Sequence, residues 1–228
     1  MSILSIQDVR YQYKNKYQTV EALKGIDYEF EKSKVYALVG KSGSGKTTLL
    51  SLMAGLDLPT KGEILFDGVS TKQMDRDKYR REDATVIYQT FNLLPLLTVL
   101  ENVMYPMELK GIRKDVAREI AAQAISKVDL DPEVYANRLP VMLSGGERQR
   151  IAVARALASD AKVILADEPT GNLDEGNSAN VMNLLTRLSH DEGYCVIIVT
   201  HDLNLADKAD VILRISDGCL SEMESARN

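Results

Sequence analysis

Hydrophobic positions follow two patterns along the chain. Short continuous apolar runs, each long enough for one buried strand, alternate with longer stretches in which apolar residues recur at helical spacing. The continuous runs are 34–39, 84–88, 162–168 and 195–200. Buried strands that alternate with helices predict an α/β core built around a parallel sheet.

Further strands are indicated by compact or alternating segments bounded by turns. Segments 3–9 and 26–30 predict short strands with a polar loop between them, and 62–68 predicts a strand between two turns. Segments 211–215 and 219–223 are joined through Asp217 and Gly218, a pair typical of a tight hairpin turn. The chain is therefore expected to close with a hairpin.

Helices are expected at 49–53, 98–110, 113–128, 151–158 and 178–189. Thr98 and Glu101 form a capping-box pattern at the start of the second helix, and Gly111 is expected to end it. Pro132 and Pro140 are expected in loops. The apolar face of the third helix is expected to carry Val116, Ile120, Ala124 and Val128.

Composition is that of an ordinary globular chain of 228 residues, with 45% hydrophobic and 27% charged residues. The net charge of −5 argues against nucleic acid as the main partner. Cys195 and Cys219 have neither zinc-site nor disulfide-framework spacing, and we expect buried free thiols. No apolar run approaches the roughly 18 residues of a membrane span, and no signal peptide opens the chain. A soluble, cytosolic protein is therefore expected.

A glycine-rich segment at 40–48 matches the phosphate-binding pattern G-x-x-x-x-G-K-[ST]. It follows the strand run 34–39 and precedes the helix at 49–53, as this motif requires. Its glycines allow a tight turn in which successive N–H groups face one anion. Lys46 is expected to bind the outer phosphates, and the Thr47 hydroxyl to bind magnesium. The segment therefore predicts binding of a nucleoside triphosphate through Gly40, Lys41, Ser42, Gly43, Ser44, Gly45, Lys46, Thr47 and Thr48.

Two carboxylates, Asp167 and Glu168, close the apolar run 162–168. Ligands of open α/β sheets bind at the carboxyl ends of the strands, so these side chains are expected beside the phosphate loop. Neighbouring strand residues point to opposite faces, so one is expected to hold magnesium through water and the other to activate the attacking water. His201 ends another buried strand and is expected either to contact the terminal phosphate or to be an ordinary loop residue.

Two further features allow two interpretations each. Residues 144–147, Ser-Gly-Gly-Glu, are either a capping box or an anion site at a helix N-terminus. Since one phosphate loop already serves one nucleotide, a second anion site indicates a site shared between two chains. Tyr11, Tyr13 and Tyr17 either pack in a strand, which spacing alone favours, or stack on a purine.

Taken in order, these motifs resemble those of the ATP-binding-cassette (ABC) ATPases, and the resemblance covers essentially the whole chain. The matching motifs are the Walker A loop at 40–48, the Q-loop Gln89, the signature at 143–147, the Walker B strand at 163–168, the D-loop at 173–174 and the switch His201. The signature distinguishes this family from other P-loop enzymes. Segments 88–93, 96–103 and 166–174 are similar to the macrolide-efflux, lipoprotein-release, cell-division and peptide-antibiotic-resistance subgroup.

The resemblance implies an α/β P-loop NTPase fold with a RecA-like parallel-sheet core, an N-terminal antiparallel β subdomain and an α-helical subdomain. It implies a single domain over 1–228. The nucleotide-binding core with its β subdomain is expected at 1–88 and 159–228. The Q-loop, the helical subdomain and the signature helix are expected at 89–158.

The resemblance also implies residue roles. Tyr13 is expected to stack on adenine, which replaces the strand-packing interpretation for this tyrosine alone. Magnesium is expected on Thr47 and Gln89, with Asp167 acting through water, while Glu168 is the general base and His201 the γ-phosphate sensor. The residues expected to act on the nucleotide of an opposite subunit are Ser144, Gly145, Gly146, Glu147 and Asp174.

The implied function is ATP hydrolysis with Mg²⁺ by a peripheral subunit on the inner face of the membrane. Its implied partners are a second copy of the chain and a separate transmembrane permease, with no nucleic acid. The apolar stretch Phe91, Leu93, Leu94, Leu96 and Leu97 either lines a groove for that permease or packs in the helical subdomain. The alternatives are an ABC ATPase that regulates an extracytoplasmic enzyme and a soluble ABC ATPase of DNA repair or translation. The second lacks support, because the chain has one cassette, no heptads and no cysteine cluster.

Two positions depart from the wider family. Glu147 stands in the signature where glutamine is usual, and glutamate also occurs in the subgroup, so we expect no loss of activity. The segment 140–142, Pro-Val-Met, is more apolar than the family pattern just before the signature. Related transporters turn this segment toward the membrane partner, so its contacts are expected to differ.

Overall fold

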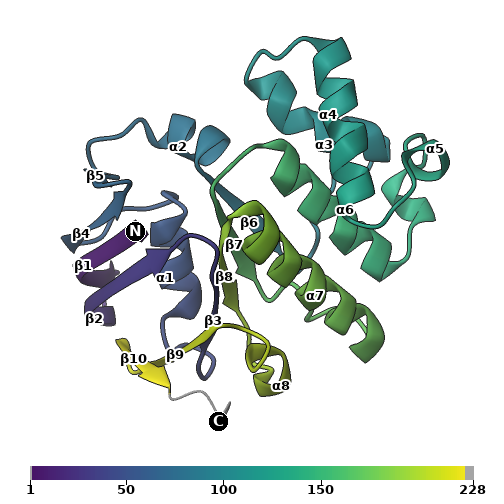
Figure 1. Cartoon of the computed structure of the whole chain (residues 1–228). Helices are drawn as coiled ribbons and strands as arrows, with labels where there is room; N and C mark the ends of the chain where they lie inside the picture. Colours follow the sequence, from purple (N-terminus) through teal and green to yellow (C-terminus); the bar gives the residue numbers. More distant parts are fainter. Residues whose placement is uncertain (1, 224–228) are drawn as a thin grey trace.

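The structure, a computed structural model that describes residues 2–223, is organised around a six-stranded sheet (Figure 1). The strand order is β10-β9-β3-β8-β7-β6, and all neighbouring pairs are parallel except β10 with β9. This confirms the predicted parallel core. The strands are β3 (Val35–Val39), β6 (Ala84–Tyr88), β7 (Val163–Asp167), β8 (Cys195–Val199), β9 (Val211–Ser216) and β10 (Cys219–Met223).

Both faces of the inner strands β3, β7 and β8 are buried, which explains their continuous apolar runs. Along β3, Val35, Ala37 and Val39 face one hydrophobic cluster, which also contains the apolar side chains of α7 (Glu175–Glu192). Tyr36 and Leu38 face a second cluster, which contains those of α1 (Lys46–Met53). The two helices therefore cover opposite faces of the sheet, and α1 begins where β3 ends.

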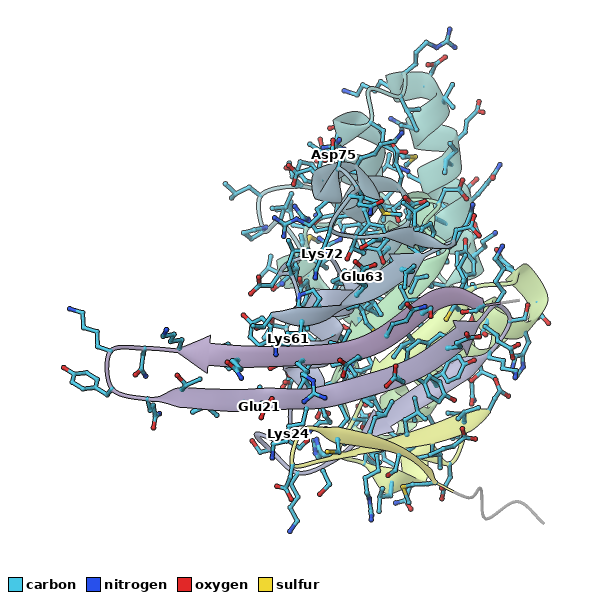
Figure 2. The ribbon with its side chains drawn as sticks, turned by 90° about the vertical axis from the view of Figure 1, so that its left-hand side faces the viewer. Glu21, Lys24, Lys61, Glu63, Lys72 and Asp75 are labelled. Carbon is cyan, nitrogen blue, oxygen red and sulfur yellow. The ribbon has the colours of Figure 1, made fainter. Side chains whose placement is uncertain are left out.

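A second, antiparallel sheet has the order β2-β1-β4-β5 and packs on the far side of α1 (Figure 1). Its strands are β1 (Ser2–Lys14), β2 (Thr19–Glu31), β4 (Lys61–Phe66) and β5 (Val69–Ser70). The expected polar loop between short strands at 3–9 and 26–30 is wrong. Pairing continues through Tyr13 and Val20, and Figure 2 shows the resulting hairpin projecting beyond the rest of the sheet.

The projecting hairpin is exposed on both faces, with residues 12–21 all exposed, so the sequence there lacks an apolar strand pattern. A bulge helps β1 to change register, with Asp8 in the left-handed region at φ 41°. Tyr17 lies near the tip and is 94% exposed, so the strand-packing interpretation of this tyrosine is wrong.

Four helices between β6 and β7 form a separate group, seen at the upper right of Figure 1. Thr98 caps α3 (Val99–Leu109), and both capping-box hydrogen bonds with Glu101 form, as the sequence predicted. The group consists of α3 (Val99–Leu109), α4 (Lys114–Lys127), α5 (Pro132–Tyr135) and α6 (Gly145–Ala158).

Two further helices lie outside this group. They are α2 (Arg76–Glu82), which the sequence analysis did not predict, and α8 (Leu203–Ala206). The subdomain bounds expected from the resemblance stay a prediction.

Several local predictions were wrong. Pro132 and Pro140 open a short α-helix and the 3₁₀ turn Pro140–Met142, because proline suits a first helical position, where its missing N–H is not needed. Val116 is 38% exposed, since the buried face of α4 is set by Ala117, Ala121, Ala124 and Ile125, whereas Ala124 and Val128 are buried as expected. Cys195 is buried as expected, but Cys219 is exposed on the edge strand β10.

No helix within residues 2–223 has the length and apolar character needed to cross a bilayer.

Candidate nucleotide-binding site

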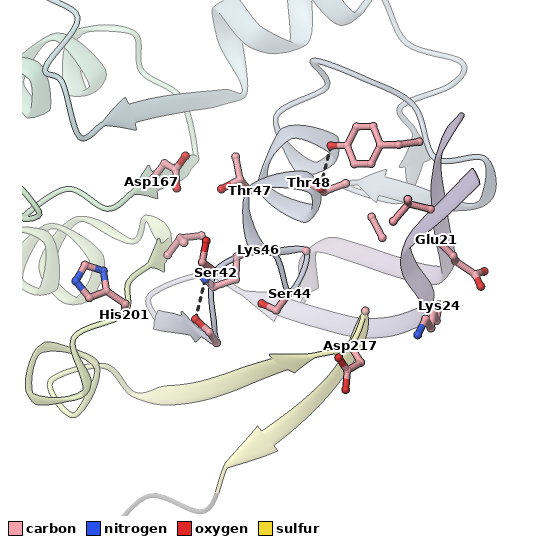
Figure 3. Close-up of a pocket in the computed structure, with 18 of the residues that line it drawn as sticks. Glu21, Lys24, Ser42, Ser44, Lys46, Thr47, Thr48, Asp167, His201 and Asp217 are labelled. Carbon is pink, nitrogen blue, oxygen red and sulfur yellow. Dashed lines mark hydrogen bonds between the residues drawn. The ribbon is translucent and has the colours of Figure 1, made fainter. Parts of the chain in front are cut away.

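The phosphate-loop segment lines a cavity of about 610 Å³ between the two sheets (Figure 3). The loop turns through Gly43 and Gly45, whose φ angles are 77° and 111°. A Cβ atom on Gly45 would lie 2.7 Å from the carbonyl oxygen of Ala22, so only glycine fits there. Gly45 precedes α1 at its N-cap position and offers no capping side chain. The first amides of α1 are therefore left for a ligand at the positive end of the helix.

Lys46 is buried at the centre of the loop, with only 8% of its surface exposed. Its Nζ atom donates to the carbonyl oxygens of Gly40 at 2.8 Å and Lys41 at 3.0 Å. These two bonds hold the ammonium group in place and offset part of its desolvation. Nζ carries three protons, so one donor is left for an anion in the cavity.

Asp167 and Glu168 reach the same cavity from the carboxyl end of β7. Burial raises the pKa of Asp167, the charge of Glu168 adds to this, and Lys46 opposes it. Glu168 has already left the strand, at φ 49°. The two carboxylates thus differ in direction because the backbone turns between them, rather than by strand alternation as the sequence analysis assumed.

His201 follows β8 and also lines the cavity. Its Nδ1 atom lies 2.9 Å from Oε2 of Glu168, and its side chain is 74% exposed. Figure 3 shows Asp167, Thr47 and His201 around the same end of the cavity as Lys46. The structure therefore brings together the catalytic and phosphate-binding residues that the sequence predicted separately.

Tyr13 also lines the cavity, and its hydroxyl lies 3.0 Å from Oγ1 of Thr48. The ring is 52% exposed, so a planar ligand can reach it. Tyr11 supports it edge-on at 5.0 Å between ring centroids, and the Tyr11 hydroxyl donates to Asp57 at 2.5 Å. This bond and burial raise the pKa of Tyr11 to about 12.

Three of the predicted site features lie outside this cavity. Gln89 turns toward Asn172: its amide donates to Oδ1 of Asn172 at 3.3 Å, and the Asn172 amide donates to the Gln89 carbonyl at 3.0 Å. Ser144 caps α6 and Asp174 caps α7. The capping-box interpretation of 144–147 is confirmed, since both of its hydrogen bonds form.

The starts of α6 and α7 lie against each other. Gly146 is buried, and a Cβ atom there would lie 2.3 Å from Oδ1 of Asn177, the residue that donates to Asp174. Ser144 and Asp174 themselves are exposed. The two motifs therefore present a common exposed surface away from the cavity of their own chain.

Comparison with known proteins agrees with this geometry. The ABC transporter family matches residues 23–171, which include the phosphate loop, the signature and β7. The chain belongs to the ABC transporter family of ATPases.

Related ABC proteins extend over nearly the entire chain. The ABC transporter ATP-binding protein YclH of Bacillus subtilis is 41% identical over 99% of this chain and 98% of its own length. The lipoprotein-releasing system ATP-binding protein LolD of Legionella pneumophila is 40% identical over 97% of this chain and 98% of its own.

Solved structures of the ABC cassette MJ0796 of Methanocaldococcus jannaschii match with a TM-score of 0.87, 36% identity and 99% coverage of both chains. One is described as a dimeric structure, and the other as a dimeric post-hydrolysis state bound to ADP and phosphate.

The donor set of this ABC ATPase fits a magnesium ion bound together with a nucleotide. Within residues 2–223, no three His, Cys, Asp or Glu side chains gather as a metal site. The cavity instead offers the Thr47 hydroxyl and the Asp167 carboxylate. Mg²⁺ is usually bound by one or two carboxylates together with substrate phosphates and water, so few protein ligands are required. Gln89 does not line the cavity, and its role as a ligand stays a prediction.

Some residues around the cavity were missed by the sequence analysis. Glu21 and Lys24 of β2 and the Asp217–Gly218 turn also line the cavity. The turn itself was predicted, and its positive φ angles of 50° and 80° suit a tight hairpin. Its place beside β2, where the amide of Lys24 donates to the Gly218 carbonyl at 2.9 Å, depends on tertiary packing that carries no local signal.

Proposed function

We propose that the chain is the ATP-hydrolysing subunit of a membrane complex in which two copies close over two Mg²⁺-ATP and drive a separate transmembrane permease. The observation that carries this proposal is the division of the site. The cavity holds the phosphate loop, Glu168 and His201, whereas Ser144 and Asp174 lie on another exposed surface. A second copy placed head to tail supplies that surface to each cavity.

ATP binds in this proposal with its adenine on the exposed ring of Tyr13 and its phosphates against Lys46 and the α1 amides. Thr47 and Asp167 would hold Mg²⁺, and Gln89 is the third proposed ligand. The ion neutralises negative charge on the phosphate oxygens when it is bound. All of these groups except Gln89 line the cavity, which supports the assignment.

Glu168 is proposed as the general base. It takes a proton from water as the water oxygen forms a bond to the γ-phosphorus and the bond from that phosphorus to the ADP oxygen breaks. His201 contacts both Glu168 and the γ-phosphate, so it positions the carboxylate and senses the phosphate. The 2.9 Å contact between the two side chains supports this role.

The second copy is proposed to contribute Ser144, Gly145 and Gly146 to the γ-phosphate and Asp174 to the interface. The solved MJ0796 structures support a dimer, because both are described as dimeric and that cassette matches 99% of this chain. With intact Glu168, His201 and signature, a homodimer has two working sites. ATP then joins the two copies, and hydrolysis releases them.

The permease is proposed to dock an apolar segment beside the Q-loop. A cavity of about 280 Å³ is lined there by Phe91, Leu93 and Val141, among others, and Val141 is 77% exposed. Leu96, 89% exposed, adds apolar surface, whereas Leu93 packs partly against the core. The stretch 91–97 is thus divided between core packing and an exposed surface.

The chain is accordingly proposed to be cytoplasmic, and held at the inner face of the membrane by the permease, without nucleic acid as a partner. The name of LolD refers to lipoprotein release. Export of lipoprotein-type, drug or peptide substrates is the corresponding activity proposed for the complex, with the permease setting the substrate.

The Glu168→Gln variant tests the two-site scheme. Without the base, ATP stays bound and a dimer is expected on a sizing column in the presence of ATP and Mg²⁺. The same variant with ADP is the control and should elute as a monomer. A protein that stays monomeric at saturating ATP contradicts the scheme. Purification of the chain from native membranes should in addition yield a companion with membrane-spanning segments.

A further inference from the structure

The glutamate of the signature is held at both carboxylate oxygens. Oε2 of Glu147 accepts the backbone N–H of Ser144 at 2.7 Å, which is one half of the capping box. Oε1 accepts the hydroxyl of Tyr135 at 2.6 Å. Tyr135 comes from α5, so this bond connects the start of the signature helix to a separate short helix. The carboxylate is therefore fixed in orientation by two different elements.

The Ser144 hydroxyl is held by the same arrangement. Its Oγ atom accepts the backbone N–H of Glu147 at 3.3 Å, and the hydroxyl also hydrogen-bonds to the Glu147 carboxylate. Ser144 is exposed, whereas Glu147 is partly buried. The signature thus presents the Ser144 side chain at the surface and ties its carboxylate into the first turn of α6.

Glu147 carries a negative charge at this position. The hydrogen bonds from Tyr135 and from the Ser144 backbone lower its pKa, with a smaller contribution from Arg150. A carboxylate within a few ångströms of a triphosphate repels it by an amount that grows as water is excluded. Glutamine at the same place would have no such charge. A signature with glutamate therefore needs a device that keeps the carboxylate away from the nucleotide.

We propose that Tyr135 is that device: it is a positioning residue that holds Glu147 back in the capping geometry, so that the partner's γ-phosphate meets the Ser144 hydroxyl and not the carboxylate. The inference rests on the proposed two-copy site, in which the signature meets the nucleotide of the other chain. Arg138 supports Tyr135, since its guanidinium carbon lies 4.4 Å from the centre of the Tyr135 ring.

Removal of the hydroxyl alone isolates this effect. Tyr135→Phe keeps the ring, its partial packing against the core and its contact with Arg138. The substitution removes the hydrogen bond to Oε1, so the Glu147 side chain can rotate toward the nucleotide of the partner copy. The loss of one hydrogen bond to a charged, partly exposed group should weaken ATP-driven dimerisation about three- to tenfold.

The experiment measures the dimer dissociation constant at saturating ATP by analytical ultracentrifugation, in the Glu168→Gln background. Tyr135→Phe should raise this constant about three- to tenfold and leave ATP binding to the monomer within about twofold. In a Glu147→Gln background, Tyr135→Phe should change the dimer dissociation constant less than about twofold, because no charge has to be kept away from the nucleotide. Tyr105→Phe, on the neighbouring α3, is the matched control and should have no effect.

The outcomes separate the two proposals. A parent Glu168→Gln protein that does not dimerise overturns the proposed function, and this inference falls with it. A parent that dimerises, with Tyr135→Phe equal to it, overturns the inference alone. An equal loss in the Glu147 and Glu147→Gln backgrounds also overturns it, because the hydroxyl would then support the fold and not the carboxylate.

Discussion

The Glu168 carboxylate and the His201 imidazole are in direct contact across the ends of two neighbouring parallel strands, with 2.9 Å between Oε2 and Nδ1. Glu168 holds this place at φ 49°, a left-handed backbone that is unfavourable by about 1–2 kcal/mol for a residue with a Cβ atom. The chain therefore stores local strain at the residue proposed as its base, as is common at functional sites.

His201→Ala removes the partner that orients Glu168. We expect kcat for ATP hydrolysis to fall about 100-fold, as for the loss of a positioned acid–base group, because the carboxylate no longer faces the attacking water. ATP affinity should change less than about threefold, since Lys46 and the loop amides remain. Steady-state turnover and fluorescent-nucleotide binding measure the two effects. Unchanged turnover would show that the contact has no catalytic role.

Lys46→Ala removes the buried ammonium group that donates to the carbonyls of Gly40 and Lys41. A charge-assisted hydrogen bond contributes roughly 1.5–3 kcal/mol, so ATP binding should weaken by at least about tenfold. Lys61→Ala, at an exposed position of β4 (Figure 2), removes a lysine that does not line the cavity and is the control. Near-normal ATP affinity of the Lys46 variant would contradict the phosphate-loop assignment.

Asp167→Asn should stabilise the protein when no nucleotide is bound. Burial and the Glu168 charge raise the Asp167 pKa in the folded protein, so the ionised carboxylate opposes folding. The neutral carboxyl does not, so the stability that depends on it is fully present below about pH 4 and is lost as pH rises through the folded pKa. Asparagine has no charge to bury. We expect a gain on the order of 1 kcal/mol at pH 7, or about 2–4 °C in Tm.

The pH dependence distinguishes this explanation from a general packing effect. The Tm difference between Asp167→Asn and the unmodified protein should shrink as pH falls toward 4, where the aspartate becomes neutral as well. Glu119→Gln, on the exposed side of α4, is the control and should shift Tm little at any pH. A difference that stays constant from pH 7 to pH 4 would exclude the ionisation of Asp167 as its cause.

The accuracy of the sequence predictions depended on how local the determining interaction is. Thr98 with Glu101 and Ser144 with Glu147 are four-residue patterns, and both form the predicted bonds. The continuous runs gave the central strands, because a sheet covered on both faces needs apolar side chains throughout.

The failures involve residues whose place is set by distant parts of the chain. Tyr17 reads as a strand aromatic but lies near the tip of a hairpin with nothing packed on it. Glu168 continues an apolar strand in sequence, yet its backbone turns after Asp167 to reach His201. No sequence pattern singled out Arg155, and only the fold shows which carbonyls its guanidinium contacts.

Tyr13→Ala tests the proposed adenine contact. Stacking of a base on an aromatic ring contributes roughly 1–3 kcal/mol, so ATP affinity should fall about fivefold or more. Tyr13→Phe keeps the ring and loses only the exposed contact with Thr48, so its affinity should stay within about threefold of the original. Tyr17→Ala, in the same hairpin but 94% exposed, is the control and should bind ATP normally. Equal affinity of all three variants would place the base elsewhere.

Arg155 of α6 holds the backbone that follows Gln89. Its guanidinium donates to the carbonyl of Asn92 at 2.6 Å and to that of Phe91 at 3.1 Å, and both residues are left-handed, at φ 48° and 63°. Burial lowers the Arg155 pKa, so the charge is kept there at some cost to stability. The two bonds connect the signature helix to the segment proposed to meet the permease.

Arg155→Lys should break this connection while keeping the charge, because a single ammonium lacks the planar fork that reaches two carbonyls at once. We expect the free energy of unfolding to fall by about 1–3 kcal/mol and amide exchange at 90–94 to accelerate more than elsewhere in the helical group. Arg118→Lys, exposed on α4, should change neither. If amide exchange at 90–94 stayed as slow as before, the left-handed pair Phe91 and Asn92 would be held by its own packing. The Arg155 hydrogen bonds would then not be what connects the signature helix to the segment after Gln89.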